Sequence, residues 1–288
     1  MDSIEKHCEM AYRSAKLVQH PFPYFVIDDF LPAETFAQLV KSGFSAQAQL
    51  KRQFETSLEA GKTVHSNEGM NATANIPIKL LGGEFGSKLI GDLFGINDVS
   101  SMFDRPNFGG YYPFHQMSSG GLLGSHVDHS FSTDQEVHVG NCIFYAHSRW
   151  QDDWGGETVL FDSFGFKDVA RVVPKPNRLL VFMHSSHSFH GVDVVKCPPL
   201  EKRMTYYMDY YASKENARLA YDKYQVPPNS SALKSWVHGT TFVPFRPLGN
   251  FKNLNILILK QFKTEAIYVL VYCKYLFGCL LAKIGFAR

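Results

Sequence analysis

The first forty residues alternate between helix-like and strand-like patterns. Residues 3–18 have the composition of a helix, with Ser3 placed to cap its N-terminus. Tyr24–Ile27 is an apolar run that follows two prolines, which predicts a buried strand. From Leu31 onward, apolar residues recur at helical spacing after a proline in the first turn, so we expect a second helix there.

The next segment is more polar and harder to assign. Residues 51–78 lack a clear period, and we interpret them as a surface loop. Leu80–Phe94 predicts another helix, weakened by its four glycines. The loop holds four polar residues that we interpret as loop residues and not as a site: His65, Ser66, Asn67 and Asn71.

From about Asn107 the pattern becomes one of short apolar runs separated by Gly, Pro and Asp turns. That pattern is typical of a jelly roll or β-sandwich and not of a parallel α/β sheet. Lys214–Tyr224 is again helical in composition. The predicted strands are Gly110–Gln116, Val139–Ala146, Thr158–Phe161, Leu179–Met183, Val192–Val195 and Met204–Tyr211.

We therefore predict an α+β fold with a mainly β core, on which N-terminal helices pack. The length of 288 residues suits one large core with a small extension. The predicted divisions are an N-terminal extension of the catalytic domain at 1–106, the core at 107–213, a helix and linker at 214–250, and a basic apolar tail at 251–288.

The tail differs from the rest in charge and hydropathy. From Phe251 it carries six basic residues and Glu265 as its one acid, within strongly apolar sequence. Three interpretations stay open: an amphipathic helix on a membrane surface, a helix packed on its own domain or a partner, and a poor transmembrane helix. Lys274 interrupts the longest apolar run, which disfavours the third.

Composition excludes several classes of protein. The net charge of +2 gives no general argument for nucleic acid, and we expect no nucleic-acid partner. The five cysteines are widely spaced without a CxxC pair, which argues against a disulfide framework or a cysteine zinc site. The polar N-terminus has no apolar signal region, so a cytoplasmic location is expected, with membrane association possible only through residues 251–288.

The candidate chemistry centres on His126 and Asp128, in the sequence Gly-Ser-His-Val-Asp. Two side chains separated by one residue on a strand point to the same face, so an imidazole and a carboxylate can reach one point. His190, which opens a predicted strand, is our candidate third ligand. Two histidines and one carboxylate form the facial triad of non-heme Fe(II) oxygenases. His184 and His187 are expected on the loop before that strand, and His129 is interpreted as a solvated loop residue.

Arg203 lies thirteen residues after His190, in a strand-like run. A buried arginine needs a partner, and a carboxylate cosubstrate would supply a bidentate one. Thr205 faces the same way on the strand and offers a hydroxyl donor. The alternative is a surface arginine at the start of a strand.

Taken in order, these motifs resemble one family. Tyr112-Pro113, His126-x-Asp128, Tyr145, Gly155-Gly156-Glu157-Thr158, His190-Gly191-Val192 and Arg203-x-Thr205 follow one another. From Pro21 to Ala212 the chain resembles the 2-oxoglutarate- and Fe(II)-dependent dioxygenases, in their prolyl 4-hydroxylase-like branch.

The resemblance implies a double-stranded β-helix in which His126, Asp128 and His190 hold iron and carry catalysis. It implies that Arg203 and Tyr145 bind 2-oxoglutarate, assisted by Thr205 and Tyr112. Dioxygen would be the second cosubstrate, with ascorbate as a possible addition, and the products would be succinate, carbon dioxide and a hydroxylated substrate. Gly155-Gly156 would form the turn that brings the next strand over the site.

The expected function is hydroxylation of an unactivated C–H bond. The sequence leaves the substrate open among a protein proline, a small molecule and a glycan or lipid intermediate. The first alternative is a non-catalytic jelly-roll binding module. The second is a zinc hydrolase built on His184 and His187, which lacks a helical HExxH setting.

Overall fold

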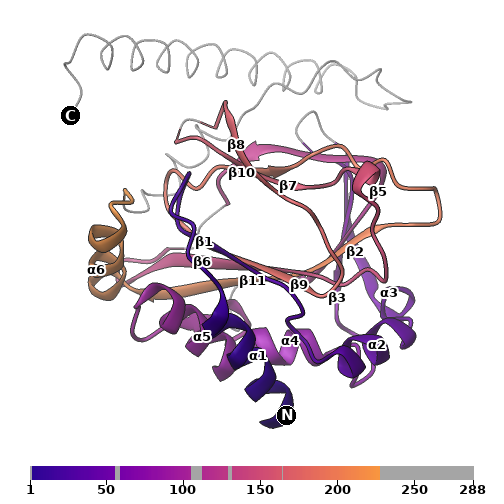
Figure 1. The fold of residues 1–288 in the computed structure, drawn as a ribbon, viewed down its shortest axis with the longest axis horizontal. Coiled ribbons are helices and arrows are strands. Elements are labelled where there is room, and N and C mark those ends of the chain that lie inside the picture. Colours follow the sequence, from indigo (N-terminus) through magenta and orange to yellow (C-terminus); the bar gives the residue numbers. More distant parts are fainter. Residues whose placement is uncertain (1, 56–58, 105–111, 129–131, 164, 228–288) are drawn as a thin grey trace.

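The computed structural model describes residues 2–55, 59–104, 112–128, 132–163 and 165–227 of the chain. Within these ranges eleven strands pair into one antiparallel sheet that curls into a nearly closed barrel (Figure 1). Neighbouring strands follow the order β1-β9-β6-β11-β5-β10-β7-β8, while β3 also pairs with β5, β2 with β3 and β4 with β11. Mainly antiparallel pairing in a curled sheet confirms the predicted jelly-roll core.

The strands have the following bounds: β1 Tyr24–Ile27, β2 Gln49–Glu55, β3 Glu59–Ser66, β4 Ser100–Ser101, β5 Phe114–His126, β6 Glu136–Tyr145, β7 Thr158–Phe161, β8 Asp168–Val172, β9 Arg178–Met183, β10 His190–Val192 and β11 Arg203–Ser213. Strand β5 is the longest. Its first residues pair with β11, and its last residues pair with β10. Strand β5 therefore lies between β11 and β10 in the sheet and connects the two groups of strands on either side of it.

Helices cover one face of the barrel, below β1, β9, β6 and β11 in Figure 1. They are α1 Asp2–Ser14, α2 Ala33–Lys41, α3 Phe44–Gln47, α4 Ile76–Gly82 and α5 Glu84–Phe94, while α6 Lys214–Tyr224 lies at one end of the sheet. Short 3-10 turns occupy Met102–Asp104 and Asp152–Trp154. The main hydrophobic core fills the space between helices and sheet, with Phe94, Leu89 and Phe144 fully buried. The predicted packing of N-terminal helices on the core is thus confirmed.

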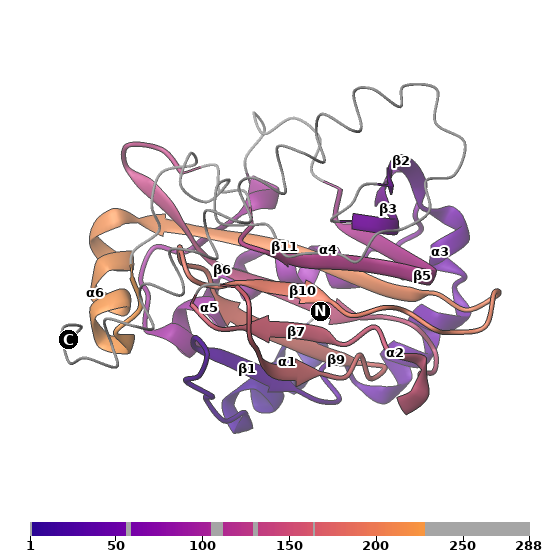
Figure 2. The same cartoon turned by 90° about the horizontal axis from the view of Figure 1, so that it is seen from above.

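The segment 51–78 is not a surface loop as predicted. It contains most of β2 and all of β3, which form a hairpin beside β5 (Figure 2). His65 and Ser66 are buried, at 8% and 6% exposure. Nearly all residues of β2 are exposed, so the hairpin lacks the alternation of apolar and polar residues that reveals a strand.

The predicted helix at 80–94 is two helices. Gly83 is extended, with φ −93° and ψ −169°, and it separates α4 from α5. The first helix of the chain ends at Ser14, four residues earlier than predicted. Strand β8 had no counterpart among the predicted strands.

The tail and its three interpretations lie outside the described residues. In the part of the chain that the structure describes, no helix has the length and apolar character needed to cross a bilayer. Cys8, Cys142 and Cys197 are buried free thiols.

Two glycines with left-handed backbones differ in their surroundings, so we expect their alanine variants to differ in stability. Gly61 in β3 has φ +63°, and an added Cβ would lie 2.8 Å from Gly121 Cα on β5. Gly43 has φ +64° but no atom within 4 Å of such a Cβ. We expect Gly43→Ala to cost about 1 kcal/mol from backbone strain alone, and Gly61→Ala to cost about 1–3 kcal/mol more from the close contact.

The free energies of unfolding of both variants, from urea denaturation, test this difference. Equal losses in the two variants would show that β3 can move away from β5 without cost.

Candidate active site

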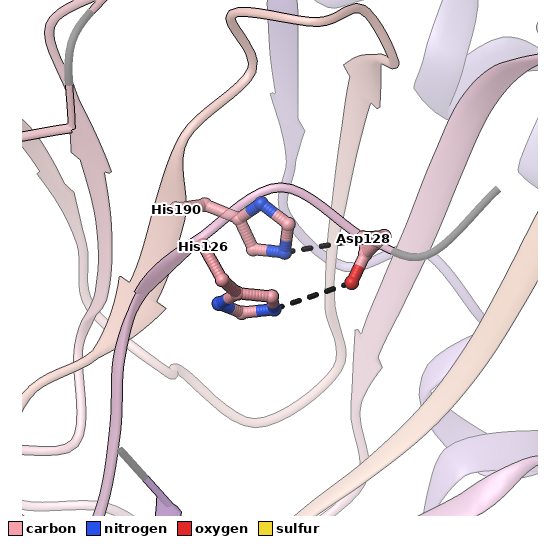
Figure 3. Close-up of side chains that lie close together, drawn as sticks. All are labelled: His126, Asp128 and His190. Atoms are coloured by element: carbon pink, nitrogen blue, oxygen red, sulfur yellow. Dashed lines mark hydrogen bonds and ion pairs between the residues drawn. The ribbon is translucent and has the colours of Figure 1, made fainter. Parts of the chain in front are cut away.

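Strand pairing brings His126 and His190 together across 64 positions of sequence. His126 is the last residue of β5, and His190, the first residue of β10, is its direct partner in the antiparallel ladder. Their ring centroids are 4.4 Å apart. Asp128 follows two residues after β5 has ended, so the expectation that it shares a strand with His126 is wrong. The chain leaves the ladder after His126 and turns the carboxylate back toward both rings (Figure 3).

The three side chains converge on one point. Asp128 Oδ1 lies 3.2 Å from His126 Nε2, and Asp128 Oδ2 lies 3.3 Å from His190 Nε2. One ligand atom from each of the three residues fits within a mutual distance of 4.8 Å. Among the described residues this is the one group of three or more His, Cys, Asp or Glu with that spacing.

Hydrogen bonds orient both rings for metal binding. His126 Nδ1 lies 2.9 Å from the carbonyl of Gly124, and His190 Nδ1 lies 3.0 Å from that of Ser188. A carbonyl only accepts, so each Nδ1 carries a hydrogen, and Nε2, the nitrogen that faces Asp128, is the one that binds a metal once it has lost its proton. This is the arrangement by which metal-binding histidines are usually held. Two imidazole nitrogens and one carboxylate oxygen therefore fit Fe(II).

The charges at the site are mutually stabilised. Burial acts to raise the pKa of Asp128, but His190 and His126 outweigh it and hold that pKa well below its usual range. Burial acts to lower the pKa of His190, but Asp128 outweighs it and raises that pKa. The carboxylate is thus ionised at neutral pH, as a metal ligand must be.

Arg203 is buried, at 4% exposure, so it is not the surface arginine of the alternative interpretation. Its Nε donates to the carbonyl of Gly156 at 2.8 Å, and one terminal nitrogen donates to Thr158 Oγ1 at 2.9 Å. Burial lowers the pKa of Arg203, opposed by Tyr145 and Glu157, but the guanidinium remains charged at neutral pH. Among the described residues, no carboxylate lies within 4.0 Å of it.

The other predicted cosubstrate residues fall at different places. Tyr145 is fully buried and hydrogen-bonded to Thr158 Oγ1 at 2.7 Å, with the guanidinium of Arg203 5.1 Å from its ring centroid. Thr205, two residues after Arg203, lines a cavity together with Arg203 and Thr158, and Tyr145 lies behind that lining against the guanidinium. Tyr112 lies apart from the cavity lining, where its carbonyl accepts from His115 Nε2 at 3.0 Å. The structure therefore brings together Arg203, Tyr145 and Thr205, but not the side chain of Tyr112.

One cavity of about 210 Å³ joins the triad to Arg203. Sequence reasoning did not assign several residues of its wall, because their contacts depend on which strands pair. The lining comprises Lys62, His115, Gln116, Met117, Leu123, His126, Asp128, Ile143, Thr158, His190, Gly191, Val192, Arg203, Thr205 and Tyr207.

His184 and His187 lie on the loop between β9 and β10, as predicted. His184 is fully buried, and its ring stacks on His138 with centroids 3.7 Å apart. Burial holds the pKa of His184 well below its usual range, so the ring is neutral. The two residues do not join a metal-binding group in the described structure, so nothing there favours the zinc hydrolase. His129 lies outside the described residues.

Comparison with protein families finds one match over the β core. Residues 112–208 match the model of the 2OG-Fe(II) oxygenase superfamily, a range that contains all three triad residues and Arg203. No curated protein matches the chain.

Solved structures with a similar fold include several hydroxylases. A prolyl-4-hydroxylase from Pseudomonas putida is 14% identical with a TM-score of 0.46, over 72% of this chain and 97% of that one. A prolyl hydroxylase from Trichoplax adhaerens, in complex with a hypoxia inducible factor peptide fragment, is 16% identical with a TM-score of 0.44, over 76% and 94%. HygX from Streptomyces hygroscopicus, with nickel, 2-oxoglutarate and hygromycin B bound, is 8% identical with a TM-score of 0.44, over 66% and 83%.

A curled antiparallel barrel with a His-Asp-His cluster is the arrangement expected of a metal-dependent oxygenase core. Residues 112–208, which contain the triad and Arg203, match the 2OG-Fe(II) oxygenase superfamily model in addition to this fold and cluster. This match supports an enzyme, a 2-oxoglutarate-dependent dioxygenase, over a non-catalytic binding module.

Proposed function

We propose that the protein hydroxylates an unactivated C–H bond and converts 2-oxoglutarate to succinate in the same turnover. The observation that carries the proposal is the single cavity that contains both the triad and a buried arginine without a carboxylate partner in the described chain. When bound, Fe(II) supplies the activation of dioxygen that neither carboxylates nor imidazoles provide.

The residues of the chain bind and orient the reactants. His126, Asp128 and His190 would hold the metal as two imidazole ligands and one carboxylate ligand, the donor set of the facial triad. Arg203 takes the far carboxylate of 2-oxoglutarate, because that anion supplies the partner that its buried charge lacks. Thr158 and Tyr145 hold the guanidinium in place through their hydroxyl and ring. Thr205 is a further donor on the wall beside it.

The substrate enters from the part of the cavity lined by Lys62, His115 and Tyr207. The rings of His115 and Tyr207 stack with centroids 5.3 Å apart and form a flat wall near the triad. Burial, with a smaller contribution from Lys62, holds the pKa of His115 well below its usual range, so this ring is neutral at pH 7. A flat, neutral wall suits a protein proline, a small molecule or a glycan.

Succinate formation tests the proposal without knowledge of the substrate. Purified full-length protein is incubated with Fe(II), ascorbate, oxygen and 2-oxoglutarate, beside a His126→Ala control. We expect slow succinate formation by the wild-type protein and none by the control. If the wild type forms no succinate and 2-oxoglutarate gives no stabilisation on heating, the proposed reaction is wrong.

A further inference from the structure

A buried amide lies between the metal-binding carboxylate and a second carboxylate behind it. Asn141, in the middle of β6, is fully buried. Its Nδ2 lies 3.1 Å from Asp128 Oδ2 and 2.6 Å from Asp209 Oδ1. Asn141 and Asp209 are direct partners in the pairing of β6 with β11, so the fold itself fixes their contact.

The surroundings determine which way this amide points. Asn141 Nδ2 faces three oxygens, because Tyr207 Oη lies 2.8 Å away in addition to the two carboxylates. Asn141 Oδ1 has no hydrogen-bond partner in the described part of the chain. The opposite orientation would place the amide oxygen against two carboxylates, so the nitrogen must face them.

Asp209 is anchored in turn by His138. Its Oδ1 lies 3.3 Å from His138 Nε2, which also lies 3.1 Å from the carbonyl of Gly140. Both neighbours are acceptors, so Nε2 carries the hydrogen and donates. The ring of His138 is stacked between His184 and Tyr211, at centroid distances of 3.7 and 5.0 Å, which prevents it from turning.

Asp128 needs such support because it lies beyond the end of β5. Its Oδ1 faces His126 and its Oδ2 faces both His190 and Asn141, so the amide limits rotation of the carboxylate about its terminal bond. Outer partners of this kind orient metal ligands, and their loss usually weakens metal binding.

We propose that Asn141, anchored by Asp209, is a positioning residue that presents the Asp128 carboxylate to the metal. The inference rests on the proposed dioxygenase function, since it requires the triad to bind a metal. It adds a residue from β6 and one from β11 to the machinery of the site, and neither touches the metal or the cosubstrate.

The test is the affinity of the full-length protein for Co(II), a redox-stable probe for the Fe(II) site, by titration calorimetry and by the visible spectrum of bound Co(II). We expect Asn141→Ala and Asp209→Ala each to raise the Kd about 10- to 100-fold. Asp209→Asn retains an oxygen that accepts from Asn141, so it should stay within about twofold of wild type. In the Asn141→Ala background, Asp209→Ala should add less than about twofold, because the two residues act in series.

A buried asparagine elsewhere serves as the control for a purely structural role. Asn177 exchanges two hydrogen bonds with the backbone of Leu31 and does not line the cavity of the triad. Asn177→Ala should lower thermal stability and leave the Kd for Co(II) unchanged. Asn141→Ser, which keeps a hydroxyl near Asp209 but is too short to reach Asp128, replaces the alanine variant if that one does not fold.

The outcomes separate the two proposals. Failure of the wild type to bind Co(II) overturns the metal site and the proposed function with it. Binding by the wild type together with an unchanged Kd in folded Asn141 variants overturns the positioning role alone. The same follows if Asn177→Ala raises the Kd as much as Asn141→Ala does.

Discussion

Asp128→Ala is expected to abolish succinate formation and to weaken Co(II) binding by more than about 100-fold, since loss of an outer partner alone costs about 10- to 100-fold. Asp128 is the one carboxylate of the triad, and its negative charge offsets part of the charge of a divalent cation. The variant retains both imidazoles, but two neutral ligands give neither the third bond nor the charge.

Asp28→Ala is the matched control for this variant. Asp28 also pairs with a buried side chain, Arg178, through Oδ2 at 2.9 Å from a guanidinium nitrogen, but it lines no part of the cavity. The variant Asp28→Ala should lower the free energy of unfolding and leave the Kd for Co(II) as in the wild type. Tight Co(II) binding by folded Asp128→Ala would mean that the metal sits elsewhere.

The residues predicted from sequence were those whose chemistry can be read from short motifs. A histidine and a carboxylate two residues apart, a second histidine before a glycine, and an arginine within a strand are local patterns. The apolar runs that predict the neighbouring strands are also local patterns, and the predicted strand Thr158–Phe161 has the same bounds as β7. The pairing of His126 with His190 follows once these strands adopt a jelly roll.

Contacts that depend on strand register could not be predicted. Asn141 lies within an apolar run that predicts only a buried strand. Its contacts with Asp128 and Asp209 depend on the register in which β6 pairs with β11. Strand β2 was missed because an exposed strand has no apolar face to give a period, and β3 was missed because polar residues such as His65 and Ser66 occupy its buried positions. Lys62 therefore could not be placed at the cavity.

Two buried arginines at strand starts differ in a way that supports Arg203 as the proposed cosubstrate anchor. Arg178, which opens β9, has Asp28 as its carboxylate partner. Arg203, which opens β11, donates to a carbonyl and a hydroxyl, lies beside Tyr145, and is influenced by Glu157 without forming an ion pair with a described carboxylate. A buried cation without a paired carboxylate is costly, and a dianion that binds beside it reduces that cost.

Arg203→Ala should therefore raise the KM for 2-oxoglutarate by at least about 30-fold, because truncating one partner of a buried charge pair costs about 2–5 kcal/mol. Arg203→Lys should recover only part of this loss, since an ammonium cannot form the two parallel hydrogen bonds of a guanidinium. Co(II) affinity measured without 2-oxoglutarate should be unchanged in both variants, which separates this effect from that of Asp128→Ala.

Arg178→Ala controls for the loss of a buried arginine as such. It should destabilise the fold by leaving Asp28 without its partner and should not change the KM for 2-oxoglutarate. An unchanged KM in folded Arg203→Ala would contradict the assignment of Arg203. A raised KM in both arginine variants would instead point to a general loosening of the barrel, because Arg178 pairs with Asp28 and does not line the cavity.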